Sequence, residues 1–185
     1  MAFVEERADE ELYDEERARR GYVPNFLRAL SQRPDVYRAW MQLNRTILGG
    51  MDERRYELAT LAAARRLRSS YCSLAHGKVL AEKFYDADGV RALPAGLDEA
   101  DAAIMEFADR VAADATAITQ ADVDRLRTLG LTDEEIVSVA AAAAARCFFS
   151  KLLDSLGAQP DALFNELEPA LRDALTVGRP IAQAS

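Results

Sequence analysis

Histidine, cysteine and tryptophan are scarce in this chain. Its 185 residues include one histidine, two cysteines and one tryptophan. A structural zinc site takes four ligands, usually cysteine and histidine, and a catalytic site usually takes three, so a single histidine argues against a metal centre. Two cysteines, Cys72 and Cys147, do not form the disulfide framework of a small secreted protein. We therefore expect no metal, no cofactor and no structural disulfide.

Positive charge and long apolar runs are also lacking. The chain has 23 lysines and arginines against 31 acidic residues, for a formal net charge of -8 and a pI near 4.8. No basic stripe is present, which argues against nucleic acid or an anionic membrane as a partner. Runs such as 136–145 fall short of the roughly 20 apolar residues of a membrane span. The N-terminus has no secretory signal pattern, and we expect a cytoplasmic protein without a transmembrane helix.

Sustained period-two alternation with β-branched residues is missing, so strands are not expected. Half of the residues are hydrophobic, and the length suffices for one domain with a sizeable core. We predict a single all-α domain of about eight or nine helices. Residues 1–20 are expected to form a charged helix or docking arm with a solvated face, 21–176 the helical domain, and 177–185 a loose tail.

Capping residues predict where several helices begin. Asp52 and Asp98 are expected N-caps, and Thr119 and Thr132 each start a capping-box pattern. The second capping box opens the longest expected helix, Asp133 to Leu156, with six consecutive alanines at its centre. Such a smooth surface favours close approach of another alanine-rich helix, and we expect the helix that carries Glu57 to be that partner.

Three other segments carry weaker signals. The sequence from Asp86 to Gly89 lacks the ligand pattern of a calcium loop and is predicted to be a turn. Leucines at 163, 167 and 171 predict a last helix. Trp40 is expected to pack in the core, with Leu43 on the same inward face; lining a pocket is the alternative for Trp40.

The segment from Glu57 to His76 has the strongest signs of chemistry. Apolar residues follow Glu57 at helical spacing, which predicts a partly buried carboxylate. A serine at 69 or 70 can cap a second helix and place Cys72 in its first turn, where the helix dipole favours a thiolate. His76 follows on the same face and can take the thiol proton. Taken singly, a lone cysteine or histidine is more often a packed or satisfied residue.

The spacing of Glu57, position 69, Cys72 and His76 resembles the Glu-x11-Cys-x2-Cys-x3-His pattern of the carboxymuconolactone decarboxylase and alkylhydroperoxidase D superfamily. The closest resemblance is to its peroxidase-related branch, with Ser69 in place of the first cysteine. Further segments agree with that branch, and together they extend the resemblance from about Gly21 to Asp161: 23–30, 33–34, 122–136 and 156–161.

The resemblance implies an AhpD-like helical bundle that assembles as a trimer or hexamer. It also implies a thiol peroxidase in which Cys72 attacks H2O2 or an organic hydroperoxide, His76 is its base and Glu57 belongs to the proton relay. Ser69 cannot resolve a sulfenic acid, so reduction is expected from an external thiol or from Cys147. Inside its helix, Cys147 is otherwise expected to be a buried, inert thiol.

Two alternatives remain open from the sequence. One is a redox-inactive oligomeric binding or stress-associated scaffold of the same fold. The other is a lyase similar to carboxymuconolactone decarboxylase, which uses histidine and carboxylate without thiol chemistry. A Cys72→Ser variant separates a lyase from a peroxidase, because only the peroxidase needs the sulfur.

Overall fold

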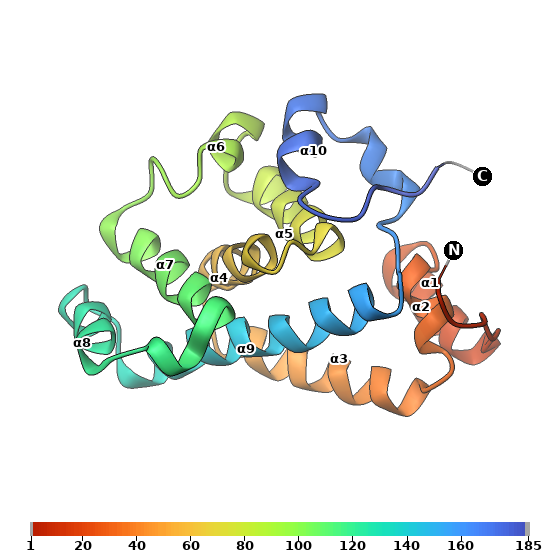
Figure 1. Ribbon diagram of the computed structural model, residues 1–185, viewed down its shortest axis with the longest axis horizontal. Coiled ribbons are helices and arrows are strands. Elements are labelled where there is room, and N and C mark those ends of the chain that lie inside the picture. Colours follow the sequence, from red (N-terminus) through yellow and green to blue (C-terminus); the bar gives the residue numbers. More distant parts are fainter. Residues whose placement is uncertain (1, 184–185) are drawn as a thin grey trace.

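The computed structural model describes residues 2–183, and all regular secondary structure within that range is helical (Figure 1). Ten α-helices and two short 3-10 helices form one domain, and this confirms the predicted all-α class. The helices are α1 Glu10–Arg20, α2 Asn25–Leu30, α3 Pro34–Gly49, α4 Glu53–Arg66, α5 Ser70–Lys83, α6 Ala87–Ala92, α7 Glu99–Asp114, η1 Ala115–Ala117, α8 Gln120–Thr128, α9 Asp133–Ser155, η2 Ala162–Glu166 and α10 Pro169–Leu175.

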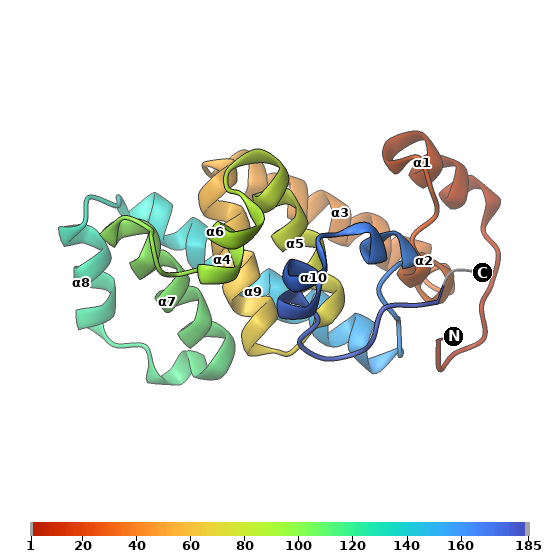
Figure 2. The same ribbon diagram turned by 90° about the horizontal axis from the view of Figure 1, so that it is seen from above.

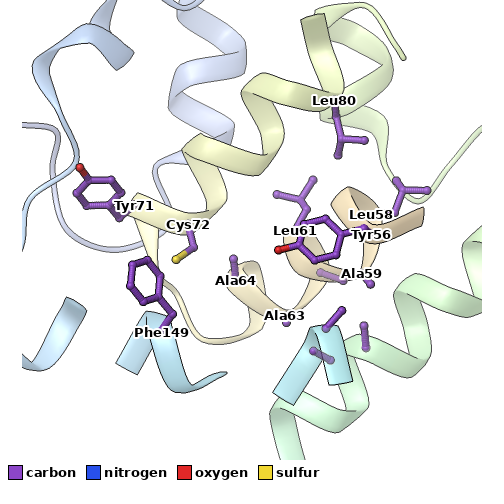
Figure 3. Close-up of a cluster of buried hydrophobic side chains, with 14 of the residues drawn as sticks. Tyr56, Leu58, Ala59, Leu61, Ala63, Ala64, Tyr71, Cys72, Leu80 and Phe149 are labelled. Carbon is purple, nitrogen blue, oxygen red and sulfur yellow. The ribbon is translucent and has the colours of Figure 1, made fainter. Parts of the chain in front are cut away.

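Helix α4 is the centre of the core. It packs against α5, α7 and α9, and nine consecutive residues from Tyr56 to Ala64 are buried (Figure 3). The predicted pairing of the two alanine-rich helices is confirmed, because α4 contacts α9 and Ala142 and Ala143 of α9 are buried. Small side chains on both surfaces let the helices approach closely. Glu57 therefore lies in the interior of the domain, with 6% of its surface exposed.

The predicted caps begin the helices where expected. Asp52 accepts a hydrogen bond from the Arg55 backbone N–H, and Asp98 accepts one from that of Asp101. Thr119 and Thr132 both form capping boxes. Each of these caps satisfies backbone donors that have no partner inside the helix.

Two predictions about the middle and the end of the chain were wrong. The segment expected to be a turn begins α6, because Asp86 caps it by accepting from the Gly89 N–H and Val90 packs into the core. The expected leucine helix is split into η2 and α10. Glu168 caps α10 and Pro169 occupies its first position, where a proline is tolerated but cannot continue an earlier helix.

The face of α3 also differs from the expectation. Tyr37, Trp40 and Met41 point into the core, whereas the side chain of Leu43 is 50% exposed. Trp40 stacks on Phe149 of α9 with ring centroids 4.6 Å apart.

The charged helix α1 docks on the domain instead of standing free. It lies beside α2 at one end of the molecule, near the start of α3 (Figures 1 and 2). Leu12 is fully buried, and Glu16 has only 4% of its surface exposed. The helix ends at Gly21, whose φ of 83° is the left-handed conformation that favours glycine. The helix is therefore present, with Leu12 and Glu16 buried against the domain and most of its other residues exposed.

The segment after α10 is held by hydrogen bonds. The Gly178 N–H donates to Ser70 Oγ at 2.7 Å, the Arg179 guanidinium donates to the Asp154 carbonyl, and the Ala182 N–H donates to the Pro160 carbonyl. The expectation of a loose tail therefore does not fit residues 177–183, and 184–185 lie outside the described residues.

Helix α9 is long and apolar enough to cross a membrane by length and composition alone, with a mean hydropathy of 1.6 over its most apolar window. Half of that window is buried inside the domain, where α9 packs against α3, α4 and α7. This burial is typical of the core helix of a globular protein.

Candidate active site

Helices α1, α3, α4, α5 and α9 surround one cavity of about 400 Å³. Its lining combines the predicted reactive residues with aromatic and cationic side chains from distant parts of the chain. The lining residues are Arg19, Arg20, Tyr22, Phe26, Trp40, Met41, Asn44, Glu57, Tyr71, Cys72, Ala75, His76, Lys78, Val79, Arg146, Phe149, Leu163 and Phe164.

Cys72 occupies the first turn of α5, as the sequence predicted. Ser69 is the N-cap with an extended backbone, so Cys72 is the third residue of the helix. Its side chain borders the same cavity as Tyr71 and Phe149, which are labelled with it in Figure 3, and only 2% of the residue is exposed. Ser69 itself is fully buried.

Arg146 of α9 is the polar neighbour of the thiol. Its Nη1 lies 3.5 Å from Cys72 Sγ, and its Nη2 donates to the Tyr56 hydroxyl at 3.3 Å. The guanidinium also lies over the rings of Trp40 and Phe149, at 5.7 and 5.9 Å from their centroids. Burial opposes its charge, but Cys72, Tyr56 and nearby groups outweigh this and raise the pKa of Arg146 above its ordinary value. A fixed positive charge therefore faces the sulfur.

His76 pairs with Glu57 across the α4–α5 contact. The imidazole Nδ1 lies 2.5 Å from Glu57 Oε2. Burial and the charge of Arg146 lower the pKa of His76, against the opposing effect of Glu57. A neutral imidazole that donates its Nδ1 proton to the carboxylate keeps Nε2 as an acceptor. The pair can therefore accept and return a proton inside the cavity.

The structure brings three of the predicted site residues to one cavity and leaves one out. Cys72, His76 and Glu57 all line it. Within residues 2–183, no hydrogen bond joins His76 to Cys72. The thiol instead accepts a hydrogen bond from Arg146, and His76 pairs with Glu57. Cys147 does not line the cavity; it is a half-buried free thiol, and burial raises its pKa.

The sequence reasoning missed the role of Arg146. It is the only charged residue between Glu135 and Lys151 in the apolar stretch of α9. A single cation in the middle of a core helix is costly unless it has partners, and this was the signal that could have identified it. Trp40, expected in the core, is buried and also lines the cavity.

Within the described part of the chain, no group of three or more histidine, cysteine, aspartate or glutamate residues is placed to hold a metal ion. The chemistry available at this site is that of a thiol, a guanidinium and an imidazole–carboxylate pair.

Solved structures share this fold. An uncharacterised peroxidase-related protein with an alkylhydroperoxidase AhpD core, from Ralstonia eutropha, matches with a TM-score of 0.73 and 28% identity over 83% of this chain and 85% of its own. A peroxidase-related protein from Silicibacter sp. matches with a TM-score of 0.74 and 19% identity over 86% and 91% of the two chains. The debrominase Bmp8, solved with 2,3,4-tribromopyrrole, matches with a TM-score of 0.76 and 16% identity over 94% and 97%.

No family model and no curated protein sequence matches the chain. By fold and by its structural neighbours, the chain belongs to the AhpD-like superfamily, as its sequence pattern implied. The debrominase shares the fold at low identity, which shows that this fold also supports other reactions.

Proposed function

We propose that this protein is a one-cysteine thiol peroxidase that reduces hydroperoxides in the cytoplasm. The Cys72 thiolate attacks the distal oxygen of the hydroperoxide; an S–O bond forms and the O–O bond breaks. The sulfur is oxidised to a sulfenic acid, and the leaving group departs as an alkoxide. His76 accepts the thiol proton and returns it to the alkoxide, while Glu57 orients the imidazole.

An external thiol completes the cycle. One thiol condenses with the sulfenic acid to give a mixed disulfide and water, and a second thiol displaces Cys72 and leaves as the external disulfide. An outside reductant is required because Ser69 has no sulfur and Cys147 does not line the cavity.

One observation carries the proposal: the guanidinium of Arg146 lies 3.5 Å from Cys72 Sγ, in the cavity that the His76–Glu57 pair also lines. The cation favours the attacking thiolate and can stabilise negative charge as it develops on the leaving oxygen. A buried cysteine that serves only packing has no need of a buried cation or a proton-transferring pair.

A peroxide pulse tests the proposal. After one equivalent of cumene hydroperoxide, trapping with dimedone and peptide mass spectrometry should find the adduct at Cys72. Cys147→Ser should keep the adduct, and Cys72→Ser should lose both the adduct and peroxide consumption. An unmodified Cys72 would favour the redox-inactive scaffold. A lyase activity that is unchanged in Cys72→Ser would favour the lyase.

Assembly as a homo-oligomer, a trimer or a hexamer, belongs to the same proposal. It is checked by light scattering coupled to size-exclusion chromatography, and a monomer at all concentrations would contradict it.

A further inference from the structure

More cationic than anionic side chains line the cavity, although the protein is acidic. Four cationic side chains line it, from α1, α5 and α9, against the single carboxylate of Glu57. That carboxylate is already paired with His76. The whole chain carries a formal net charge of -8. Cations concentrated in one cavity of an acidic protein indicate a ligand with a negative group. The four are Arg19, Arg20, Lys78 and Arg146.

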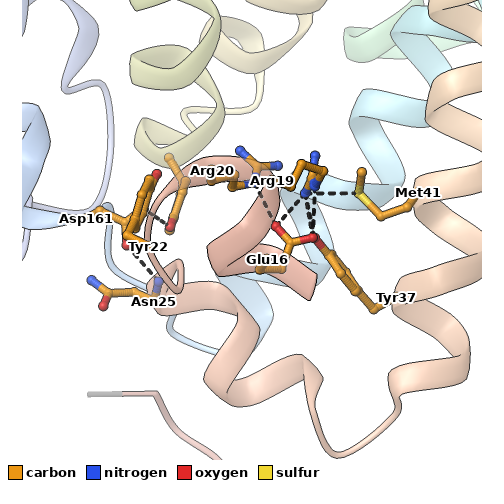
Figure 4. Close-up of polar contacts among 9 residues, drawn as sticks. Glu16, Arg19, Arg20, Tyr22, Asn25, Tyr37, Met41 and Asp161 are labelled. Atoms are coloured by element: carbon orange, nitrogen blue, oxygen red, sulfur yellow. Dashed lines mark hydrogen bonds and ion pairs between the residues drawn. The ribbon is translucent and has the colours of Figure 1, made fainter. Parts of the chain in front are cut away.

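Glu16 holds two of these cations in place. It accepts hydrogen bonds from Arg19 at 2.7 Å and from Arg20 at 2.8 Å, so two guanidinium groups share one carboxylate (Figure 4). Arg20 donates to Glu16 through its Nε. Within residues 2–183, its Nη1 and Nη2 donate no hydrogen bond. Arg20 therefore retains charge and two donor groups for a ligand. Its charge is near enough to the site to help lower the pKa of His76.

An aromatic surface runs between Arg20 and the thiol. The Arg20 guanidinium lies 6.0 Å from the centroid of Phe26, which contacts Phe149 edge to face at 5.4 Å. Phe149 stacks on Trp40, and Arg146 lies over both rings beside Cys72. Arg20 of α1 thus lies at one end of an apolar surface, and Arg146 lies at the other end, beside the sulfur.

The cavity is also much larger than hydrogen peroxide needs. A water molecule takes about 30 Å³ in the liquid, and the cavity holds about 400 Å³. This volume lies within the range of pockets that bind organic ligands.

We propose that the cavity binds amphipathic carboxylates, with the apolar body on the Phe26–Phe149–Trp40 surface and the carboxylate on Arg20 of α1. The binding of carboxylates stands by itself, and only the identity of the substrate rests on the proposed function. If the protein is a peroxidase, its substrate is an organic hydroperoxide that carries a carboxylate. Its O–O bond is cleaved at Cys72, and the carboxylate is unchanged in the alcohol product. Helix α1 would set the specificity of the enzyme.

Binding is measured first, with ligands that cannot react. Trp40 is the only tryptophan and lines the cavity, so its fluorescence reports occupancy. Decanoate is titrated against methyl decanoate, which has the same chain without the charge. We expect the acid to bind about tenfold more tightly than the ester, as a charge-assisted hydrogen bond implies.

Variants of α1 identify the anchor. Arg20→Gln should remove the preference for the acid, and Arg20→Lys should keep most of it. Arg17→Gln is the matched control, because Arg17 lies on the same helix but does not line the cavity. Circular dichroism and trypsin digestion verify that α1 stays docked in each variant. Equal binding of acid and ester to the wild type, or a preference that survives in docked Arg20→Gln, would overturn the proposal.

Turnover separates this inference from the proposed function. Linoleic acid hydroperoxide should have a higher kcat/KM than its methyl ester, and the ratio should approach one in Arg20→Gln. Equal turnover of both hydroperoxides would overturn the carboxylate preference and leave the peroxidase intact. Preferential binding of decanoate without oxidation of Cys72 by either hydroperoxide would support the anion site and reject the peroxidase.

Discussion

Arg146 Nη1 lies 3.5 Å from Cys72 Sγ, and both residues are buried, at 5% and 2% exposure. The pair joins α9 to the start of α5 by a contact between a permanent cation and a thiol. Such a contact becomes stronger when the thiol ionises, because the interior screens charge poorly. Under the proposed function, the reactivity of Cys72 should therefore depend on a residue 74 positions away.

Replacing Arg146 by methionine should slow the oxidation of Cys72. We expect the second-order rate constant with cumene hydroperoxide at pH 7 to fall about tenfold or more, because the cation beside the sulfur is lost. Exchange of a buried charge for an apolar side chain is often tolerated in folding, which keeps the variant measurable. The control is Arg65→Met, a half-buried arginine of α4 that does not line the cavity. An unchanged rate in Arg146→Met would contradict the assigned role.

Stability should depend on the protonation of His76. Burial and Arg146 lower its pKa below the ordinary value of about 6.5, so the unfolded chain binds the proton more readily than the folded one. The stabilising contribution is present above pH 6.5 and is lost as the pH falls toward the folded pKa. Urea unfolding between pH 5 and 8 should show this slope in the wild type and less of it in His76→Gln. Identical slopes would show that His76 does not titrate differently in the two states.

A cysteine at position 69 should supply the resolving thiol that this chain lacks. Positions 69 and 72 are the N-cap and third residue of α5, so both side chains lie at the same helix end. After a peroxide pulse, Ser69→Cys should contain an intramolecular disulfide with Cys72 in place of a dimedone adduct. Ser70→Cys is the matched control, since Ser70 Oγ is directed to the Gly178 N–H. Persistent sulfenic acid in Ser69→Cys would count against this geometry.

Removal of the Glu16 charge should loosen α1. Glu16→Gln leaves Arg19 and Arg20 without their shared carboxylate, and we expect a loss of about 1 to 3 kcal/mol in the free energy of unfolding. Trypsin should also cleave faster after the arginines of α1. Asp14→Asn is the control, because Asp14 is 74% exposed and pairs with Arg17 alone. An exposed pair of this kind contributes at most about 1 kcal/mol. Equal cleavage rates in both variants would show that Glu16 does not hold the helix.

Local signals in the sequence predicted much of the fold. The aspartate and threonine caps located the starts of α4, α7, α8 and α9, since a cap acts within one helical turn. The helix start before Cys72 and the burial of Glu57 followed from similar short-range patterns. The split after η2 was missed because a regular leucine spacing masked the stop imposed by Glu168 and Pro169.

Contacts between distant segments could not be predicted in the same way. Whether Arg146 or Cys147 faces the sulfur depends on how α9 is rotated against α5, and no local pattern fixes that rotation. The charge pattern of α1 is typical of a solvated helix. Its docking depends on Arg19 donating to the Tyr37 hydroxyl of α3 and on the burial of Leu12 against the domain, and both contacts involve residues far from α1 in the sequence.

The near-complete burial of Cys72 has a consequence for the second half of the cycle. Any molecule that regenerates the sulfur must pass through the same entrance as the oxidant. Under the proposed function, we therefore expect a low-molecular-weight thiol to reduce the sulfenic acid faster than a folded redox protein, because a protein would have to bring its own cysteine to a residue that is only 2% exposed. The size of the electron donor then matters as well as its reduction potential.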